Sequence, residues 1–158
     1  MKSIIAILAI FCLAVCNGAE VGSVNYQREV SYIFFDDEVD WYQARQNCKN
    51  IGGNLATISN QAANDVIVNF LDANGFFGSE DTGVWIGLND IDQENDFQWV
   101  DGSTCSYTNW GNGEPDNNNK QNPAGQDCGQ IRTSSMAWDD DYCACIRAKG
   151  YICEVEVC

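Results

Sequence analysis

The sequence contains no histidine among its 158 residues. Histidine is the one side chain whose ordinary pKa places its charge change between pH 5 and 8, and it is a common zinc ligand. Its absence excludes imidazole general bases, Ser-His and Cys-His nucleophile pairs, and histidine-bound zinc. Most hydrolytic mechanisms are therefore excluded.

Basic residues and long apolar runs are also scarce. Eight Lys and Arg residues stand against 23 acidic residues, which gives a formal charge of −15. This charge repels phosphate backbones and anionic lipids and attracts cations, so we expect no nucleic-acid partner. A membrane-spanning helix needs about 20 apolar residues, and nothing after Ala19 approaches that length. We therefore expect no membrane insertion.

The N-terminal segment has the pattern of a secretory signal. Lys2 precedes an apolar run from Ile4 to Val15, and small residues follow at Gly18 and Ala19. We expect residues 1–19 to form a signal peptide that is cleaved between residues 16 and 19. Because no internal repeat or linker follows, residues 20–158 are expected to form one secreted, extracellular domain.

The cysteine count indicates disulfides and one unpaired thiol. Of nine cysteines, two fall in the predicted signal peptide, which leaves seven. An oxidising compartment favours disulfides, and an odd number leaves one thiol free or bonded to another chain. Cys158, at the terminus, is the candidate for an interchain bridge. The hypothesis is a disulfide-linked homodimer.

Two amphipathic helices are predicted in the N-terminal half. The first follows the capping residues Asp36 and Asp37 and ends at Gly52 and Gly53. Its core-facing residues are Trp41, Ala44, Cys48 and Ile51. The second begins after Ser59 and ends near Asn74 and Gly75, with an apolar face of Ala63, Val66, Ile67, Phe70 and Leu71.

Short apolar runs separated by loops predict strands in the rest of the chain. These runs are residues 24–35, 84–88, 97–100, 130–131 and 151–155. The stretch from Thr108 to Asp127 has little apolar content and is longer than a compact domain usually tolerates without a ligand site or a bound ion.

Acidic pairs in these loops have the composition of a calcium site, because calcium takes six to eight oxygen ligands. Glu114 and Asp116 flank Pro115, and their side chains could point the same way if the preceding peptide bond were cis. Gln126 with Asp127, and Asp139 with Asp140, are two further oxygen-bearing pairs. Each lies near a cysteine, and a bridge between Cys128 and Cys143 would draw both pairs together.

Several motifs together resemble the C-type lectin domain over roughly residues 26–154. They are Trp41-Tyr42-Gln43-Ala44-Arg45, Leu55-Ala56, Trp85-Ile86-Gly87-Leu88, Phe97-Gln98-Trp99, Asn109-Trp110, Glu114-Pro115-Asp116, Gln126-Asp127-Cys128, Trp138-Asp139-Asp140 and Cys153. Each motif alone is weak, but their order and approximate spacing match the family.

The resemblance implies an α+β double-loop fold with two helices, small antiparallel sheets and a long calcium-binding loop region. It implies disulfides between Cys48 and Cys153 and between Cys128 and Cys143, with Cys145 as the competitor for Cys128. Cys105 would then pair with whichever of Cys143 and Cys145 remains.

The resemblance also implies a calcium site that binds two adjacent sugar hydroxyls without covalent chemistry. Its carbohydrate and metal ligands would be Glu114, Asp116, Gln126, Asp139 and Asp140. An auxiliary calcium would be held by Asp90, Glu94, Asn117 and Asp127.

This chain departs from the family at the sugar site. Mannose-type members carry Glu-Pro-Asn and galactose-type members Gln-Pro-Asp, whereas this chain has Glu114-Pro115-Asp116; Gln126 replaces the common Glu, and Asp139 the usual Asn. A bound hydroxyl both donates and accepts, so one amide beside one carboxylate suits it best. Gln126 beside Asp139 offers that mixture, while Glu114 beside Asp116 offers two acceptors.

Asp116 favours galactose or N-acetylgalactosamine over mannose. Galactose sites usually add an aromatic ring against the sugar face, and Tyr142 is the nearest candidate. Trp85, Trp99, Trp110 and Trp138 are instead expected in the core.

The function predicted is a calcium-dependent lectin for agglutination or innate immune recognition, with dimerisation raising its weak single-site affinity. Three other interpretations stay open. The acidic clusters could be solvated turns. Paired carboxylates suit a glycosidase, but an adjacent cation would keep both ionised, whereas a general acid must stay protonated. The chain could also be a C-type lectin-like protein that binds protein, ice or mineral surfaces without sugar.

Overall fold

The computed structural model describes residues 4–10, 29–78, 82–146, 148 and 150–157. The elements are β1 (Ile4–Ile10), β2 (Glu29–Phe35), α1 (Trp41–Asn50), β3 (Asn54–Leu55), α2 (Gln61–Ala73), β4 (Gly83–Asn89), β5 (Gln98–Trp99), β6 (Cys128–Arg132), β7 (Trp138–Asp141) and β8 (Gly150–Val157). The predicted signal cleavage and Cys158 lie outside the described residues. The first part of the predicted signal forms β1, and the signal peptide stays a prediction.

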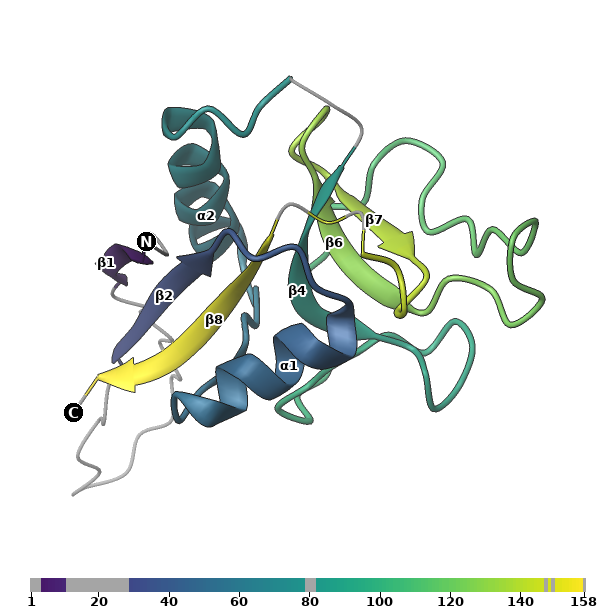
Figure 1. The fold of residues 1–158 in the computed structure, drawn as a ribbon, viewed down its shortest axis with the longest axis horizontal. Helices are drawn as coiled ribbons and strands as arrows, with labels where there is room; N and C mark the ends of the chain where they lie inside the picture. Colours follow the sequence, from purple (N-terminus) through teal and green to yellow (C-terminus); the bar gives the residue numbers. More distant parts are fainter. Residues whose placement is uncertain (1–3, 11–28, 79–81, 147, 149, 158) are drawn as a thin grey trace, which may run out of the picture.

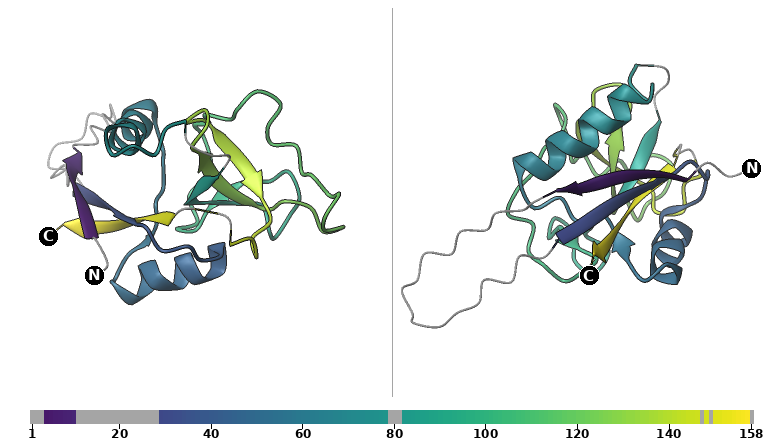
Figure 2. Two further views of the ribbon diagram at one scale, coloured as in Figure 1. Left: turned by 45° about the horizontal axis from the view of Figure 1, so that its top comes forward. Right: turned by 90° about the vertical axis from the view of Figure 1, so that its left-hand side faces the viewer.

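The strands form one sheet in the order β1-β2-β8-β4-β6-β7, with β3 added to β8 and β5 added to β4. The strand pairs are antiparallel except for β4 and β8, which are parallel. The long loops lie at the end of the molecule opposite β1 and the end of β8 (Figure 1). Helices α1 and α2 lie on opposite sides of β2 and β8 (Figure 2). The predicted α+β arrangement with two helices is confirmed, but its strands form one mixed sheet rather than several small antiparallel sheets, because β4 and β8 pair in parallel.

Strand β4 contributes side chains to two hydrophobic clusters, because its successive side chains point to opposite faces of the sheet. Val84, Ile86 and Leu88 pack in the cluster that contains the buried face of α2. Trp85 points the other way, into the cluster that contains the buried face of α1. Successive side chains of a strand face opposite sides, so an unbroken apolar run fits a strand buried on both faces.

Three of the four tryptophans expected in the core lie there, and the fourth, Trp110, packs against it. Trp85 is fully buried in the α1 cluster. In the α2 cluster Trp138 is fully buried and Trp99 nearly so, and Trp110 packs against that cluster from a partly exposed position. Of the rings in the two clusters, Trp138 has the most described aromatic neighbours, with Trp99, Trp110 and Tyr107 edge-on to it. Their packing makes these tryptophans structural and leaves no exposed indole platform among them.

Both helix starts differ from the prediction. Asp40 caps α1 and accepts a hydrogen bond from the Gln43 amide at 2.8 Å, so Asp36 and Asp37 are not the caps. Asn60, rather than Ser59, caps α2. In both helices the capping oxygen accepts from the amide three residues on, which identifies Asp40 and Asn60 as the caps.

Ile51 also lies outside the core, contrary to the prediction. It is the C-terminal capping residue of α1 rather than part of its buried stripe, and 46% of its surface is exposed. The end of the helix at Asn50 turns this side chain away from the face that carries Trp41, Ala44 and Cys48.

Within the described residues, no helix is both long enough and apolar enough to cross a membrane.

Two disulfides join elements that are distant in sequence or adjacent to the long loop. Cys48 pairs with Cys153 across 105 residues, and Cys128 pairs with Cys143. The structure does not contain the predicted third bridge between Cys105 and Cys145. The reason is that Cys105 packs against the α2 core, where its thiol donates to the Tyr107 carbonyl at 3.3 Å, whereas Cys145 packs against the α1 core.

A buried hydrogen bond links α2 to β7, and its removal should destabilise the domain. Asn64 is 3% exposed, and its side-chain oxygen accepts a hydrogen bond from the Trp138 indole nitrogen at 3.0 Å. Asn64→Ala leaves that donor unpaired, so we expect the free energy of unfolding to fall by about 1 to 3 kcal/mol in urea denaturation. Asp65→Ala, on the exposed face of the same helix, is the matched control and should change it by less than about 0.5 kcal/mol. Equal effects would contradict this assignment.

Candidate functional site

Three carboxylates from two separate segments converge where the long loop meets β7. Glu114, Asp116 and Asp140 each offer an oxygen, and these oxygens lie within 4.8 Å of one another. The peptide bond between Glu114 and Pro115 is cis. We refer to these three residues as the acidic cluster. A group of this composition could hold a metal ion.

Asp140 organises the acidic cluster. It is fully buried on β7, and its two carboxylate oxygens accept hydrogen bonds from the Asp116 amide at 3.0 Å and the Asn117 amide at 2.8 Å. Burial raises its pKa, the two amides lower it, and the Asp139 carboxylate raises it again. Asp140 therefore fixes the loop to the sheet while keeping a desolvated carboxylate in the cluster.

Glu114 has the most perturbed environment in the cluster. Burial, followed by the carboxylates of Asp139 and Asp116, raises its pKa to about 7, and Arg132 opposes the shift. The Arg132 guanidinium lies 3.7 Å from the Glu114 Oε1 atom. The other carboxylate oxygen of Glu114, Oε2, is buried and has no hydrogen-bond partner.

These features fit a divalent cation at the acidic cluster. An unpaired buried carboxylate oxygen loses its hydration without a replacement partner, and crowded carboxylates raise one another's pKa values. A cation bound among them would satisfy the oxygen and would relieve the repulsion. The donor set is made of oxygen atoms only, which suits calcium better than zinc.

Asp139 lies beside the acidic cluster and is held by two donors from β6. Its Oδ2 atom accepts from the Gln130 side-chain amide at 2.7 Å, and its Oδ1 atom accepts from Arg132 at 2.7 Å. Burial raises the pKa of Asp139, while Gln130 and Arg132 lower it. The sequence interpretation missed both donors. The predicted strand covered only residues 130–131, whereas β6 extends to Arg132, and a spacing of two residues on one strand places both side chains on one face.

The side chains of Gln126 and Asn117 form hydrogen bonds that hold the long loop together. The Gln126 side-chain oxygen accepts from the Asn118 amide at 2.8 Å, and its side-chain nitrogen donates to Asp141 at 3.2 Å. The Asn117 side-chain oxygen accepts from the Gln126 amide at 2.8 Å. The predicted amide donor beside Asp139 therefore comes from Gln130 rather than from Gln126.

Asp90 is the buried member of the predicted auxiliary set. Asp90 is 4% exposed, and its Oδ1 atom is buried without a hydrogen-bond partner. Its pKa is raised to about 6, first by burial and then by the carboxylates of Glu94, Asp127 and Asp140, against a hydrogen bond from the Asn95 amide. Glu94 and Asp127 therefore act on Asp90 through their charge, but among the described residues these three carboxyls do not form a group whose oxygens lie close enough together to hold a metal ion. The side-chain oxygen of Asn117 is used within the loop.

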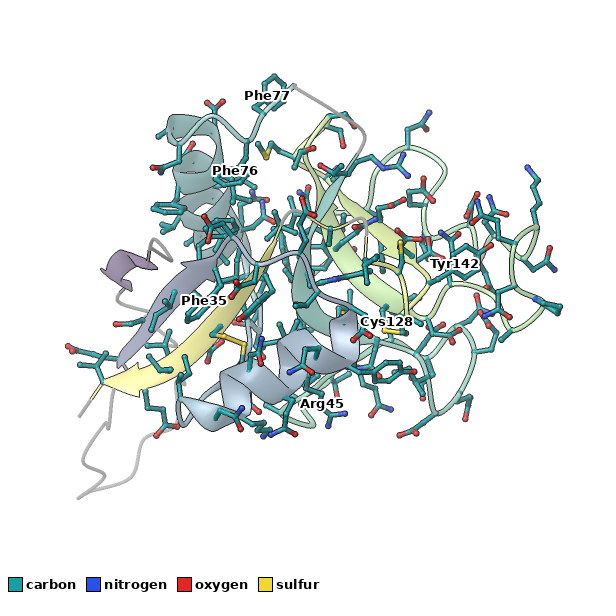
Figure 3. The ribbon with its side chains drawn as sticks, in the orientation of Figure 1. Phe35, Arg45, Phe76, Phe77, Cys128 and Tyr142 are labelled. Atoms are coloured by element: carbon teal, nitrogen blue, oxygen red, sulfur yellow. A yellow bond between two sulfur atoms is a disulfide. The ribbon has the colours of Figure 1, made fainter. Side chains whose placement is uncertain are left out.

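Tyr142 anchors the long loop. Its hydroxyl donates to the Asn118 carbonyl at 2.5 Å and accepts from the Gln121 amide at 3.1 Å. Figure 3 places Tyr142 between the end of β7 and the long loop. Its hydroxyl is therefore committed to protein contacts.

A polar cavity of about 180 Å³ lies between the long loop and the β6–β7 face that carries Asp139. Its lining includes Gln121, Gln126, Gln130, Arg132, Asp139 and Asp141. Strand β7 presents Asp139 and Asp141 to this cavity, whereas Asp140 contacts the amides of residues 116 and 117. The cavity and the acidic cluster are neighbours, because Arg132 lines the cavity and its guanidinium lies 3.7 Å from the Glu114 Oε1 atom.

Comparison with known proteins gives a consistent result. The family described as Lectin C-type domain matches residues 37–155. The human low affinity immunoglobulin epsilon Fc receptor is 33% identical over 82% of this chain, but the matched region spans only 36% of that receptor. Lectin BRA-3 of Megabalanus rosa is 27% identical over 99% of this chain and 91% of that protein. The mouse scavenger receptor C-type lectin carbohydrate-recognition domain has a similar structure, with a TM-score of 0.69 and 28% identity over 80% of this chain and 90% of that domain.

Proposed function

The chain belongs to the C-type lectin domain family, and from this premise we propose that it binds carbohydrate through a calcium ion. The observation that carries the proposal is the acidic cluster, in which three carboxylates lie within 4.8 Å and the buried Oε2 atom of Glu114 lacks a partner. Two of the similar proteins support it by their names, which describe a lectin and a carbohydrate-recognition domain.

Glu114, Asp116 and Asp140 would hold the ion, with Asp139 beside them. When bound, calcium supplies positive charge and coordination positions that two adjacent sugar hydroxyls can occupy. The protein orients these carboxylates, because Asp140 is fixed by the amides of residues 116 and 117. The carboxylates then accept hydrogen bonds from the same hydroxyls. No proton transfer or covalent step is required, so the proposed protein is a binding protein and not an enzyme.

A sugar hydroxyl that contacts the calcium ion also needs a hydrogen-bond donor from the protein. Arg132 can supply this donor. Glu114 and Asp116 are both acceptors, and the amide of Gln126 is used by Asp141. Arg132 lies 2.7 Å from Asp139 and 3.7 Å from Glu114, and its side chain is 35% exposed. We propose that Asp116 tilts the preference toward galactose or N-acetylgalactosamine over mannose.

Export and dimerisation are further parts of the proposal. The signal-like N-terminus and the two disulfides support secretion into an oxidising, extracellular environment. An interchain bridge at Cys158 would join two sites and raise avidity for multivalent surfaces, as agglutination or microbial recognition requires. Migration at twice the monomer mass on a non-reducing gel, lost on reduction, is the expected result.

Affinity chromatography tests the proposed function. With calcium, we expect retention on galactose resin, weaker retention on mannose resin, and elution from both by a chelator. Passage through both resins while calcium binding is intact would instead support the binding of protein or mineral surfaces without sugar. Passage without calcium binding would contradict both functions.

The sugar preference depends on residue 116. Asp116→Asn converts one of two neighbouring acceptors into an amide and restores the carboxylate and amide mixture found in mannose-type members. We expect the ratio of mannose to galactose affinity to rise about tenfold in a competition panel, which corresponds to one hydrogen bond of ordinary strength. Asp96→Asn, an exposed substitution with the same charge change, is the control. An unchanged panel for Asp116→Asn would contradict the preference argument.

A further inference from the structure

The sequence contains the dipeptide Asn-Gly twice, at Asn74-Gly75 and at Asn112-Gly113. In this pairing the glycine nitrogen can attack the asparagine side-chain amide, because glycine has no Cβ atom to hinder the approach. We propose that Asn112 is a site of spontaneous deamidation, and that the isoaspartate formed there weakens calcium binding at the acidic cluster. The effect on calcium rests on the proposed function, whereas the modification itself does not.

Asn74 is protected from this reaction by hydrogen bonds at the end of α2. It is the C-terminal capping residue of the helix, and its side-chain amide donates to the Phe70 carbonyl at 2.8 Å. The nitrogen of Gly75, which is the attacking atom in the reaction, donates to the Asp72 carbonyl at 3.0 Å. Both reacting groups are therefore held by the helix end, although Asn74 is exposed to solvent.

Asn112 lies in an exposed turn in which both reacting groups are accessible. The amide of Glu114 donates to the Gly111 carbonyl at 3.1 Å, which closes a turn with Asn112 and Gly113 between them. Gly113 has a φ of 92°, and both Gly113 and Asn112 are exposed. Among the described residues, neither the Gly113 amide nor the Asn112 side chain has a hydrogen-bond partner. The two dipeptides are thus equal in sequence and exposure but differ in the contacts that restrain them.

The reaction requires water as its only co-reactant. The Gly113 nitrogen bonds to the side-chain carbonyl carbon of Asn112, the carbon–nitrogen bond of the side-chain amide breaks, and the Gly113 proton leaves with the amide nitrogen as ammonia. Water then opens the resulting succinimide at either carbonyl and returns a proton to the Gly113 nitrogen. One opening gives aspartate, and the other gives isoaspartate, in which the main chain passes through the side-chain carbon.

The isoaspartate product lengthens the main chain between β7 and Glu114. The turn is tied to β7, because the Gly111 amide donates to the Trp138 carbonyl at 2.8 Å. An isoaspartate adds one carbon–carbon bond of about 1.5 Å between this contact and Glu114. Glu114 supplies an oxygen of the acidic cluster, so its displacement separates this oxygen from those of the other two carboxylates. We expect calcium affinity to fall about tenfold, as when a group that orients a metal ligand is changed.

Peptide mass spectrometry after incubation of the ion-free protein in warm neutral buffer tests the modification. Cleavage after glutamate separates the two dipeptides, because Glu94 lies between them. We expect the Asn112 peptide to convert to aspartate and isoaspartate forms while the Asn74 peptide stays an amide. In urea, which removes the contacts of Asn74, both peptides should convert. Equal conversion of the two in the folded protein, or conversion of the Asn112 peptide in urea only, would overturn the proposal.

Titration calorimetry with three samples tests the effect on calcium. Wild-type protein aged to isoaspartate should bind calcium about tenfold more weakly than fresh protein. Asn112→Gln, aged in parallel, should keep its affinity, because its longer side chain must close a larger ring and reacts more slowly. Asn112→Asp adds the exposed charge without the extra carbon and should bind calcium as fresh wild type does.

These measurements separate the modification from the proposed function. Undiminished affinity in the isoaspartate-containing protein, or an equal loss in Asn112→Asp, would overturn the effect on calcium. Absence of calcium binding in the fresh protein would overturn the proposed function and this effect together, whereas the peptides alone decide the modification.

Discussion

Asp140→Ala is expected to lower calcium affinity about a hundredfold and to abolish retention on sugar resin at millimolar calcium. Asp140 has two roles in the acidic cluster, because it supplies a buried carboxylate and also holds the amides of Asp116 and Asn117. Its removal takes away one ligand and releases the loop that presents another. Titration calorimetry with calcium measures the first effect, and resin retention measures the second.

Two further variants separate loss of the site from loss of the fold. Asp92→Ala removes the same charge from an exposed loop residue outside the cluster and should change neither readout. Glu114→Gln keeps the side-chain shape but removes a charge from the cluster, so it should weaken calcium binding in a protein with an unaltered near-ultraviolet circular dichroism spectrum. Wild-type calcium affinity in a folded Asp140→Ala protein would contradict the ligand assignment.

Calcium binding is expected to weaken at least about tenfold when the pH falls from 7.5 to 5.5. The cause is competition by protons, because burial and neighbouring carboxylates raise the pKa of Glu114 to about 7 and that of Asp90 to about 6. At pH 7.5 most of these carboxyls are ionised and accept the ion without releasing a proton. At pH 5.5 they are protonated in the ion-free protein, so binding must displace protons.

The same pKa shifts predict how the stability of the ion-free protein depends on pH. A carboxyl whose pKa is raised by folding binds more protons in the folded state, so its stabilisation is present below its unfolded pKa and is lost as the pH rises through the folded value. Calcium-free protein should therefore become less stable between about pH 4.5 and 8, and saturating calcium should remove most of this loss. Urea denaturation at several pH values measures it. Ion-free stability that rises across this range would contradict the assigned shifts.

The helices were predictable from local pattern, whereas their caps were not. Apolar spacing along one face identified Trp41, Ala44 and Cys48, because burial on a helix repeats every three or four residues. The caps at Asp40 and Asn60 depend on which side-chain oxygen reaches the amide three residues on. In each case other polar residues lie close by in the sequence, and composition does not distinguish them.

Strand β7 could not be identified from its sequence alone. Trp138–Asp141 is an acidic segment that reads as a solvated loop, yet it is buried and pairs with β6. Its burial comes from tertiary contacts, since Gln130 and Arg132 bind Asp139 and loop amides bind Asp140. Polar residues become acceptable inside a protein when such partners are present.

The acidic segments of the candidate site could be recognised in the sequence because each is a short motif. The direction in which each side chain points could not be predicted. Gln126 was predicted to face the sugar beside Asp139, and it instead closes the loop by contacts with Asn118 and Asp141. Arg132, the donor that we propose for the sugar hydroxyl, lies on β6, outside every motif that indicated the site. Side-chain direction depends on neighbours that only the folded chain brings together.

Equilibrium dialysis of the wild-type protein against calcium at pH 7.5 tests the central claim most directly. The predicted result is at least one ion bound per chain with a dissociation constant at or below about one millimolar, which is within the range of extracellular calcium sites. Glu114→Gln should reduce that occupancy, whereas Asp92→Ala should not. Absence of bound calcium at ten times that concentration, in protein with both disulfides intact, would contradict the account.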